Sequence, residues 1–233
     1  LRGLWRVGFA GVIGALGLIF AFGGAIYAIQ STTIANAVFL FSASPFITAL
    51  LGWAVLGEKV RGRTWVSIGV AAIGIAVMVQ GGLDRGALPG NIAALCSAAG
   101  FSVFTVTLRR SATAAMPIVL LGGIFSLIAG AGGAWLSLTP LVVPVADLGW
   151  SLGMGAGTLA FGMVLYSLGS RVVPAAELTL ISLLEVMLAP LLVWLVIGET
   201  VSQATLLGGV FVLGAVLLNA TGRVSRSKAA ALA

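Results

Sequence analysis

Eight long apolar runs, separated by short polar breaks, are the feature that most constrains how this chain can fold. The runs cover residues 7–29, 33–57, 64–81, 88–108, 115–138, 147–169, 174–198 and 203–221. A helix needs about 20 mostly apolar residues to cross a bilayer. The apolar residues are continuous rather than alternating, which favours spanning helices over barrel strands. The sequence therefore predicts an all-α integral membrane protein with eight transmembrane helices.

Charged residues are too scarce for a water-soluble fold. They make up 8% of the 233 residues, and hydrophobic residues 60%, whereas soluble domains carry roughly 25% charged residues. The 33 glycines suit a membrane, where small residues let helix backbones approach closely. With no His and a single Cys, Cys96, the composition excludes an internal disulfide and a His/Cys metal cluster, and it indicates no cofactor.

The basic residues gather on one side of the membrane when successive loops are assigned to alternating sides. With the N-terminus in the cytoplasm, 11 of the 12 Lys and Arg residues fall on the cytoplasmic side, and only Arg85 lies opposite. The positive-inside rule predicts this asymmetry. The pattern therefore indicates an even number of crossings with both ends in the cytoplasm. It also explains the net charge of +6 without a nucleic-acid partner.

Two parts of the chain resemble each other at a separation of about 140 residues. The matching pairs are Ala21–Tyr27 with Ala160–Tyr166, Trp53–Glu58 with Trp194–Glu199, and Gly74 with Gly214. Equivalent loops change sides, so the halves are predicted to be inverted repeats with an odd number of helices. Residues 88–221 form a five-helix repeat and residues 1–81 the last three helices of another. A complete protein would then have ten helices, with 222–233 as a cytoplasmic basic tail.

Short motifs in both halves resemble a known family. They are Ala35-Asn36-Ala37, Ser44-Pro45 and Leu56-Gly57-Glu58, then Pro174-Ala175-Ala176-Glu177, Leu184-Glu185, Ala189-Pro190 and Gly198-Glu199. Together with the repeat and the topology, they make the chain resemble the EamA type of the drug/metabolite transporter superfamily, with an N-terminal truncation. The resemblance implies a multi-pass secondary transporter of the bacterial inner membrane, with cytoplasmic termini, that exports or otherwise moves a small metabolite or drug-like solute.

Alternating access around a central cavity between the repeats is the mechanism that the sequence favours. The chain lacks a GxxxxGK[ST] phosphate loop, so it is not expected to hydrolyse ATP. A channel or a non-transporting permease subunit is the alternative, although a channel more often shows rings of like residues contributed by an oligomer. An enzyme is disfavoured, because His is absent and both aspartates, Asp84 and Asp147, fall in loops on the outer side.

Two glutamates on one predicted helix lead the candidate cavity residues. Glu185 lies near the centre of span 174–198, where a charge costs roughly 2.5–3.5 kcal/mol. It is either a proton site or substrate contact, or a protonated acid that bonds a neighbouring helix. Glu177 shares its helix face and either caps the helix N-terminus or takes part in transport. Asn36 matches Glu177 in the repeat and Ser44 matches Glu185, which predicts a cavity shared across a pseudo-twofold axis.

Aromatic and hydroxyl side chains are weaker candidates for the same cavity. Tyr27 and Tyr166 are related by the repeat. They either gate the cavity or have a packing or interfacial-belt role. Ser102 and Thr105 either line the pore or bond the backbone of their own helix.

Glycine, glutamate and proline at the span ends carry a structural expectation. Gly57-Glu58 and Gly198-Glu199 end their spans. Because an acid opposes the dipole at a helix C-terminus, each glutamate is predicted to accept hydrogen bonds from the start of the next helix, which would fix the turn. Pro45 and Pro190 are predicted helix kinks or helix starts.

Overall fold

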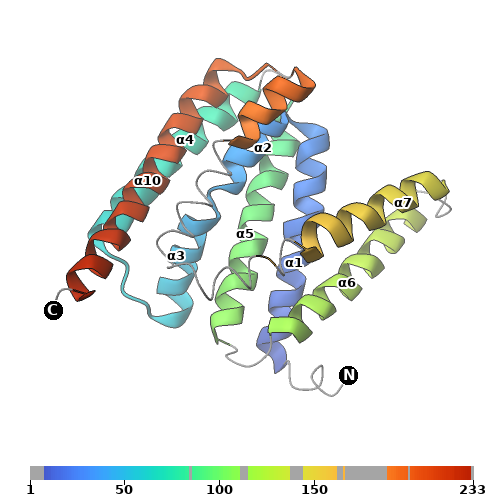
Figure 1. Cartoon of the computed structure of the whole chain (residues 1–233), viewed down its shortest axis with the longest axis horizontal. Helices are drawn as coiled ribbons and strands as arrows, with labels where there is room; N and C mark the ends of the chain where they lie inside the picture. Colours follow the sequence, from blue (N-terminus) through green and yellow to red (C-terminus); the bar gives the residue numbers. More distant parts are fainter. Residues whose placement is uncertain are drawn as a thin grey trace.

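A computed structural model describes residues 8–83, 86–110, 115–136, 144–161, 165, 188–198 and 200–231. These ranges are helical apart from short connections, and they contain no strand. The long helices lie side by side as a bundle (Figure 1). The stretches long and apolar enough to span a membrane are Gly8–Ser31, Ile34–Leu56, Gly62–Gly82, Leu88–Leu108 and Pro117–Leu136; shorter apolar helices cover Leu188–Ile197 and Gln203–Asn219. The all-α, multi-pass membrane class is therefore confirmed.

The helices α1 (Gly8–Ser31) and α5 (Leu88–Arg110) pack backbone against backbone. A Cβ on Gly17 would stand 2.6 Å from the carbonyl oxygen of Gly100, and a Cβ on Gly100 would stand 2.5 Å from that of Gly17. Further along, a Cβ on Gly24 would stand 2.8 Å from the carbonyl oxygen of Ala93. Glycine at these points is what lets the two helices approach so closely, as expected for packing within a bilayer.

The helices α4 (Gly62–Leu83) and α10 (Gln203–Ala231) run antiparallel along each other. Near one end the Thr64 hydroxyl donates a hydrogen bond to Asn219 Oδ1 (3.1 Å). In the middle, a Cβ on Gly74 would stand 2.6 Å from the carbonyl oxygen of Gly208. These are the last helices of the two predicted repeats, and inverted repeats require such opposite directions. Because α10 continues to Ala231, most of the segment predicted as a tail prolongs this helix.

The predicted span 33–57 is broken into α2 (Ile34–Phe41) and α3 (Ser44–Leu56). Pro45 stands in the first turn of α3 and has no N–H to continue the helix of α2. The Ser42 hydroxyl donates to the Phe39 carbonyl (2.6 Å) and competes with regular backbone pairing. Inside a membrane, such irregular backbone is tolerated only where it packs on protein or lines a cavity.

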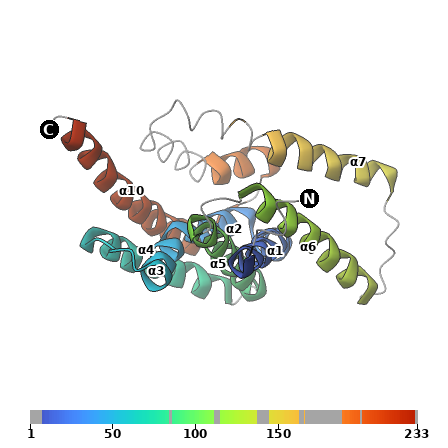
Figure 2. The ribbon, with the colours of Figure 1, turned by 90° about the horizontal axis from the view of Figure 1, so that it is seen from below.

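The helix α6 (Ala115–Leu136) packs on α1, where a Cβ on Gly122 would stand 3.1 Å from Leu18 Cβ. The helix α7 (Val145–Met154) lies apart from α1 and α5 when the bundle is seen from below (Figure 2). The described part of the predicted span 147–169 is not a regular α-helix throughout, because a π-helical segment, η2 (Gly155–Ala160), follows α7. Gly155 and Gly157 lie in η2, and glycine weakens a regular α-helix at such points.

Candidate functional site

Buried polar side chains from three helices meet at one end of the bundle. Asn36 near the start of α2, Asn91 near the start of α5 and Thr205 near the start of α10 are 3%, 0% and 4% exposed. We call these three, with Thr32 in the connection between α1 and α2, the amide cluster. It lies at the C-terminal end of α4, because a Cβ on Gly82 would stand 2.7 Å from Asn91 Nδ2.

Asn36 is the centre of the hydrogen bonds in the amide cluster. Its Nδ2 donates to Asn91 Oδ1 (2.5 Å) and to Thr32 Oγ1 (3.2 Å). Its Oδ1 accepts from the Thr205 hydroxyl (3.3 Å). Two helix caps keep the network in place: the N–H of Asn36 donates to Thr33 Oγ1, and the N–H of Thr205 donates to Ser202 Oγ. Asn36 thus links a helix of the first predicted repeat to two helices of the second.

A second polar contact, between Ser44 and Ser102, lies at the break between α2 and α3. We call it the serine pair. The fully buried Ser102 hydroxyl donates to the carbonyls of Ala98 (2.7 Å) and Ser44 (2.9 Å). The two hydroxyl oxygens lie 3.3 Å apart. The structure therefore brings together two residues that the sequence singled out, from α3 and α5.

An apolar cavity of about 230 Å³ lies between α1, α3 and α5, toward the end of the bundle where α1 begins and α3 ends. Its lining comes from three helices: Ala10 and Ile13 of α1, Leu51 and Val55 of α3, and Val103, Val106 and Thr107 of α5. Leu51 lies two turns beyond Ser44, and Val106 lies one turn beyond Ser102, on the same helix faces. Ile13 and Val55 at the rim are exposed. Along α5 the serine pair lies between the amide cluster and the cavity, and neither serine lines the cavity.

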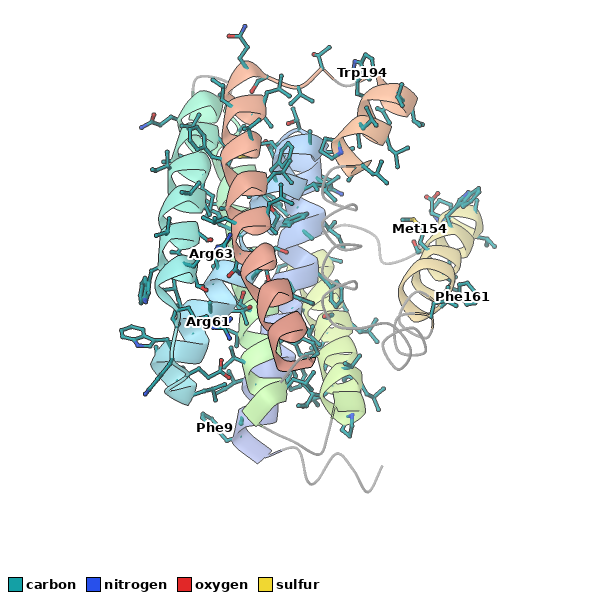
Figure 3. The ribbon with its side chains drawn as sticks, turned by 60° about the vertical axis from the view of Figure 1, so that its left-hand side comes forward. Phe9, Arg61, Arg63, Met154, Phe161 and Trp194 are labelled. Atoms are coloured by element: carbon teal, nitrogen blue, oxygen red, sulfur yellow. The ribbon has the colours of Figure 1, made fainter. Side chains whose placement is uncertain are left out.

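The cavity end of the bundle also carries exposed basic residues. Lys59 and Arg61 lie in the connection between α3 and α4. We call this the basic end. The 22 residues of α4 separate it from the amide cluster, a length of roughly 33 Å at 1.5 Å per residue. Figure 3 shows both ends: Phe9, next to Ala10 of the cavity, lies at one, and Trp194, shortly before α10 begins, lies at the other.

The other candidate residues take no part in these contacts or lie outside the described residues. Tyr27 leaves 52% of its surface exposed on α1. The Thr105 hydroxyl donates to the Phe101 carbonyl of its own helix (2.8 Å). Within the described ranges, no group of three His, Cys, Asp or Glu residues could hold a metal ion. Outside the described residues lie Glu177, Glu185, Tyr166 and Glu199.

Gly57 and Gly198, which were singled out at the span ends, both adopt a left-handed backbone conformation. Gly57 ends α3 with φ 67°, and Gly198 has φ 72°. The Glu58 carboxylate folds back over α3, because a Cβ on Gly52 would stand 2.9 Å from its Oε2. Pro190 lies in the helical segment Leu188–Ile197. Whether Glu58 and Glu199 also hold the following helix stays a prediction.

Sequence reasoning missed Asn91 and Thr205. The repeat directed attention to positions with a visible partner in the other half, and neither residue has one. The available signal was Asn91 itself, because an amide within the apolar run 88–108 needs a polar partner or a wet surrounding. Its partner Asn36 is 55 residues away in the sequence. A long-range pairing of this kind cannot be read from local pattern.

Membrane-length helices, one of them broken beside buried polar side chains, define the class as a multi-pass membrane protein. The sequence profile of the EamA-like transporter family matches residues 1–80 and 86–221. The chain therefore belongs to the EamA-like transporter family, within the drug/metabolite transporter superfamily, as its motifs indicated.

Two relatives are themselves named as transporters. An uncharacterized transporter of Archaeoglobus fulgidus is 27% identical over 201 residues, which cover 83% of this chain and 69% of that protein. The uncharacterized transporter YwfM of Bacillus subtilis is 28% identical over 216 residues, which cover 88% of this chain and 71% of that protein. No solved structure matches the chain.

Proposed function

We propose that this protein is a secondary transporter that moves a small metabolite or drug-like solute across the bacterial inner membrane by alternating access between two inverted five-helix repeats. The broken helix at the serine pair is the observation that carries the proposal. Discontinuous helices in secondary transporters place backbone groups and polar side chains where the solute binds. Here the break places Ser44 against Ser102 of α5 in the middle of the span, two helical turns before Leu51, which lines the apolar cavity.

The serine pair can exchange its internal contact for a contact to a solute. Ser102 has one hydroxyl proton, for which the carbonyls of Ala98 and Ser44 compete, and we propose that the Ser44 hydroxyl is the donor across the 3.3 Å to Ser102 Oγ. This is a long hydrogen bond, and an acceptor on the solute would replace it at little cost. The apolar lining of the cavity favours a solute with an apolar body and a small polar group.

The direction of transport is proposed from the two ends of the bundle. By the positive-inside rule, the basic end with Lys59 and Arg61 faces the cytoplasm, as do both ends of the chain. The cavity lies at this end, so a solute would enter it from the cytoplasm. Loading from the cytoplasm is what an exporter requires.

Transport can be tested with the purified protein in proteoliposomes. A solute that raises the thermal unfolding temperature of the detergent-solubilised protein is first selected from a metabolite library. That solute should then show saturable counterflow, and Ser102→Ala and Ser44→Ala should each reduce its initial rate by about tenfold. Ser67→Ala is the matched control, because Ser67 is equally buried but bonds only the Arg63 carbonyl of its own helix (3.0 Å). Flux that rises linearly with solute concentration would favour the channel.

Proton coupling is proposed at Glu185, the repeat equivalent of Ser44. Glu185→Gln keeps the size of the side chain but cannot release a proton. It should therefore abolish uptake driven by a pH gradient and leave counterflow in place, because counterflow needs no net proton movement. Normal pH-driven uptake by a well-folded Glu185→Gln protein would refute the proton site. It would not contradict the proposal that the protein is a transporter.

A further inference from the structure

The amide cluster closes the end of the bundle opposite the cavity. A Cβ on Gly90 of α5 would stand 2.7 Å from the carbonyl carbon of Ser31, which is backbone. On the other side of the cluster, a Cβ on Gly82 of α4 would stand 2.7 Å from Asn91 Nδ2, so α4 also packs closely on Asn91. Asn36, Asn91 and Thr205 are almost completely buried between these contacts. Among the described residues, the bundle is thus closed at the amide cluster and has an apolar cavity toward the basic end.

One group in the cluster lacks a partner in this closed arrangement. Asn91 Nδ2 is fully buried and has no hydrogen-bond partner in the part of the chain that the structure describes, although Asn91 Oδ1 accepts from Asn36. Burying an unpaired amide donor is unfavourable by about as much as a hydrogen bond is favourable. Separation of the helices would break the bonds of Asn36 and at the same time give water to Asn91 Nδ2. The two effects partly cancel, so the hydrogen bonds of Asn36 favour the closed arrangement, but the free-energy cost of opening it is small.

We propose that the amide cluster is the gate on the side opposite the basic end, and that it opens by release of Asn36 on α2 from Asn91 on α5 and Thr205 on α10. This inference rests on the proposed transport function. It assigns the second step of alternating access: solute binds from the basic end at the serine pair and leaves through the amide cluster. Polar gate residues suit this step, because each group that the gate releases can be hydrated.

Cysteine accessibility measures the opening of this gate without any solute. In a Cys96→Ser background, Ala35→Cys places a thiol next to Asn36, at a position that is 0% exposed in the closed arrangement. The probe is a membrane-impermeant maleimide added to proteoliposomes. The labelling rate at position 35 should rise about tenfold on Asn36→Ala, because that substitution removes both side-chain hydrogen bonds that cross the gate, to Asn91 and from Thr205.

Two further variants distinguish opening of the gate from a general loss of helix packing. Thr205→Val replaces the hydroxyl with a methyl group of similar shape, keeps the backbone cap at Ser202, and should raise the labelling rate about threefold even if Asn36→Ala folds poorly. Thr64→Ala is the matched control, since it removes a hydrogen bond between the repeats at the other end of α4. An unchanged rate in Thr205→Val, or an equal rise in Thr64→Ala, would overturn the gate. Increased labelling with no counterflow of any solute would instead count against the transport function.

Discussion

The glycine contact between α1 and α5 allows a stability prediction with its size worked from the structure. In Gly100→Ala, the new Cβ would stand 2.5 Å from the Gly17 carbonyl oxygen and 2.8 Å from the Ala21 nitrogen. Both are backbone atoms and cannot turn aside. Real Cβ contacts stay at 3.0 Å or more, so the helices must separate by about 0.5 Å. Forced separation of a packed core typically costs about 1–3 kcal/mol, and alanine returns up to about 1 kcal/mol of helix propensity. We expect Gly100→Ala to be destabilised by about 1–2 kcal/mol.

Unfolding of the purified protein in detergent, followed by circular dichroism, would check this value. Gly23→Ala is the matched control, because Gly23 lies on α1 and a Cβ there would meet nothing within 4 Å. It should be neutral or slightly stabilised by its better helix propensity. The two substitutions make the same chemical change, so their difference isolates the helix contact. If the Gly100→Ala and Gly23→Ala proteins have the same free energy of unfolding, backbone contact does not set the spacing between α1 and α5.

Two further substitutions test local features by the same unfolding measurement. Gly57→Ala places a side chain at φ 67° and should destabilise the end of α3 by about 1 kcal/mol, whereas Gly69→Ala, in open space on α4, should not; equal stability would show that the turn relaxes. Thr33→Ala removes the side chain that caps α2 and should cost about 1 kcal/mol. Thr33→Ser should restore most of that loss, and if it does not, capping is not the cause.

Most of the fold could be predicted because a bilayer leaves few choices. The run 88–108 became α5, Leu88–Arg110, with the same start and an end two residues later. Span 33–57 was predicted as one crossing from its hydropathy, but Pro45 was predicted as a helix kink or helix start, and it stands in the first turn of α3. Ser42, Ser44 and Pro45 were the local signal of the break between α2 and α3. Their combination of competing hydroxyls and a missing N–H acts on hydrogen bonding rather than on hydropathy.

The candidate site was only half accessible to sequence reasoning. Asn36 and Ser44 were identified as the repeat equivalents of Glu177 and Glu185, and Ser102 as a hydroxyl within span 88–108; the structure places all three in hydrogen bonds between helices. Which of them pair with each other depends on the tertiary fold. Asn36 and Thr205 are 169 residues apart, and only the packing of α2 beside α10 brings them together. A predicted repeat relates equivalent positions, but it does not state which non-equivalent positions touch.

The pairing of α4 with α10 has a consequence for how such a protein can arise. The repeat offset of 140 residues relates Gly74 to Gly214, and a Cβ on Gly74 would stand 3.0 Å from Val212 Cγ2, so equivalent stretches of the two helices pack on each other. A face that packs on its own inverted copy is self-complementary. Two separate half-length chains inserted in opposite orientations could therefore associate through it before any fusion. In the predicted repeat the two halves also differ, because Ser44 in one half corresponds to Glu185 in the other.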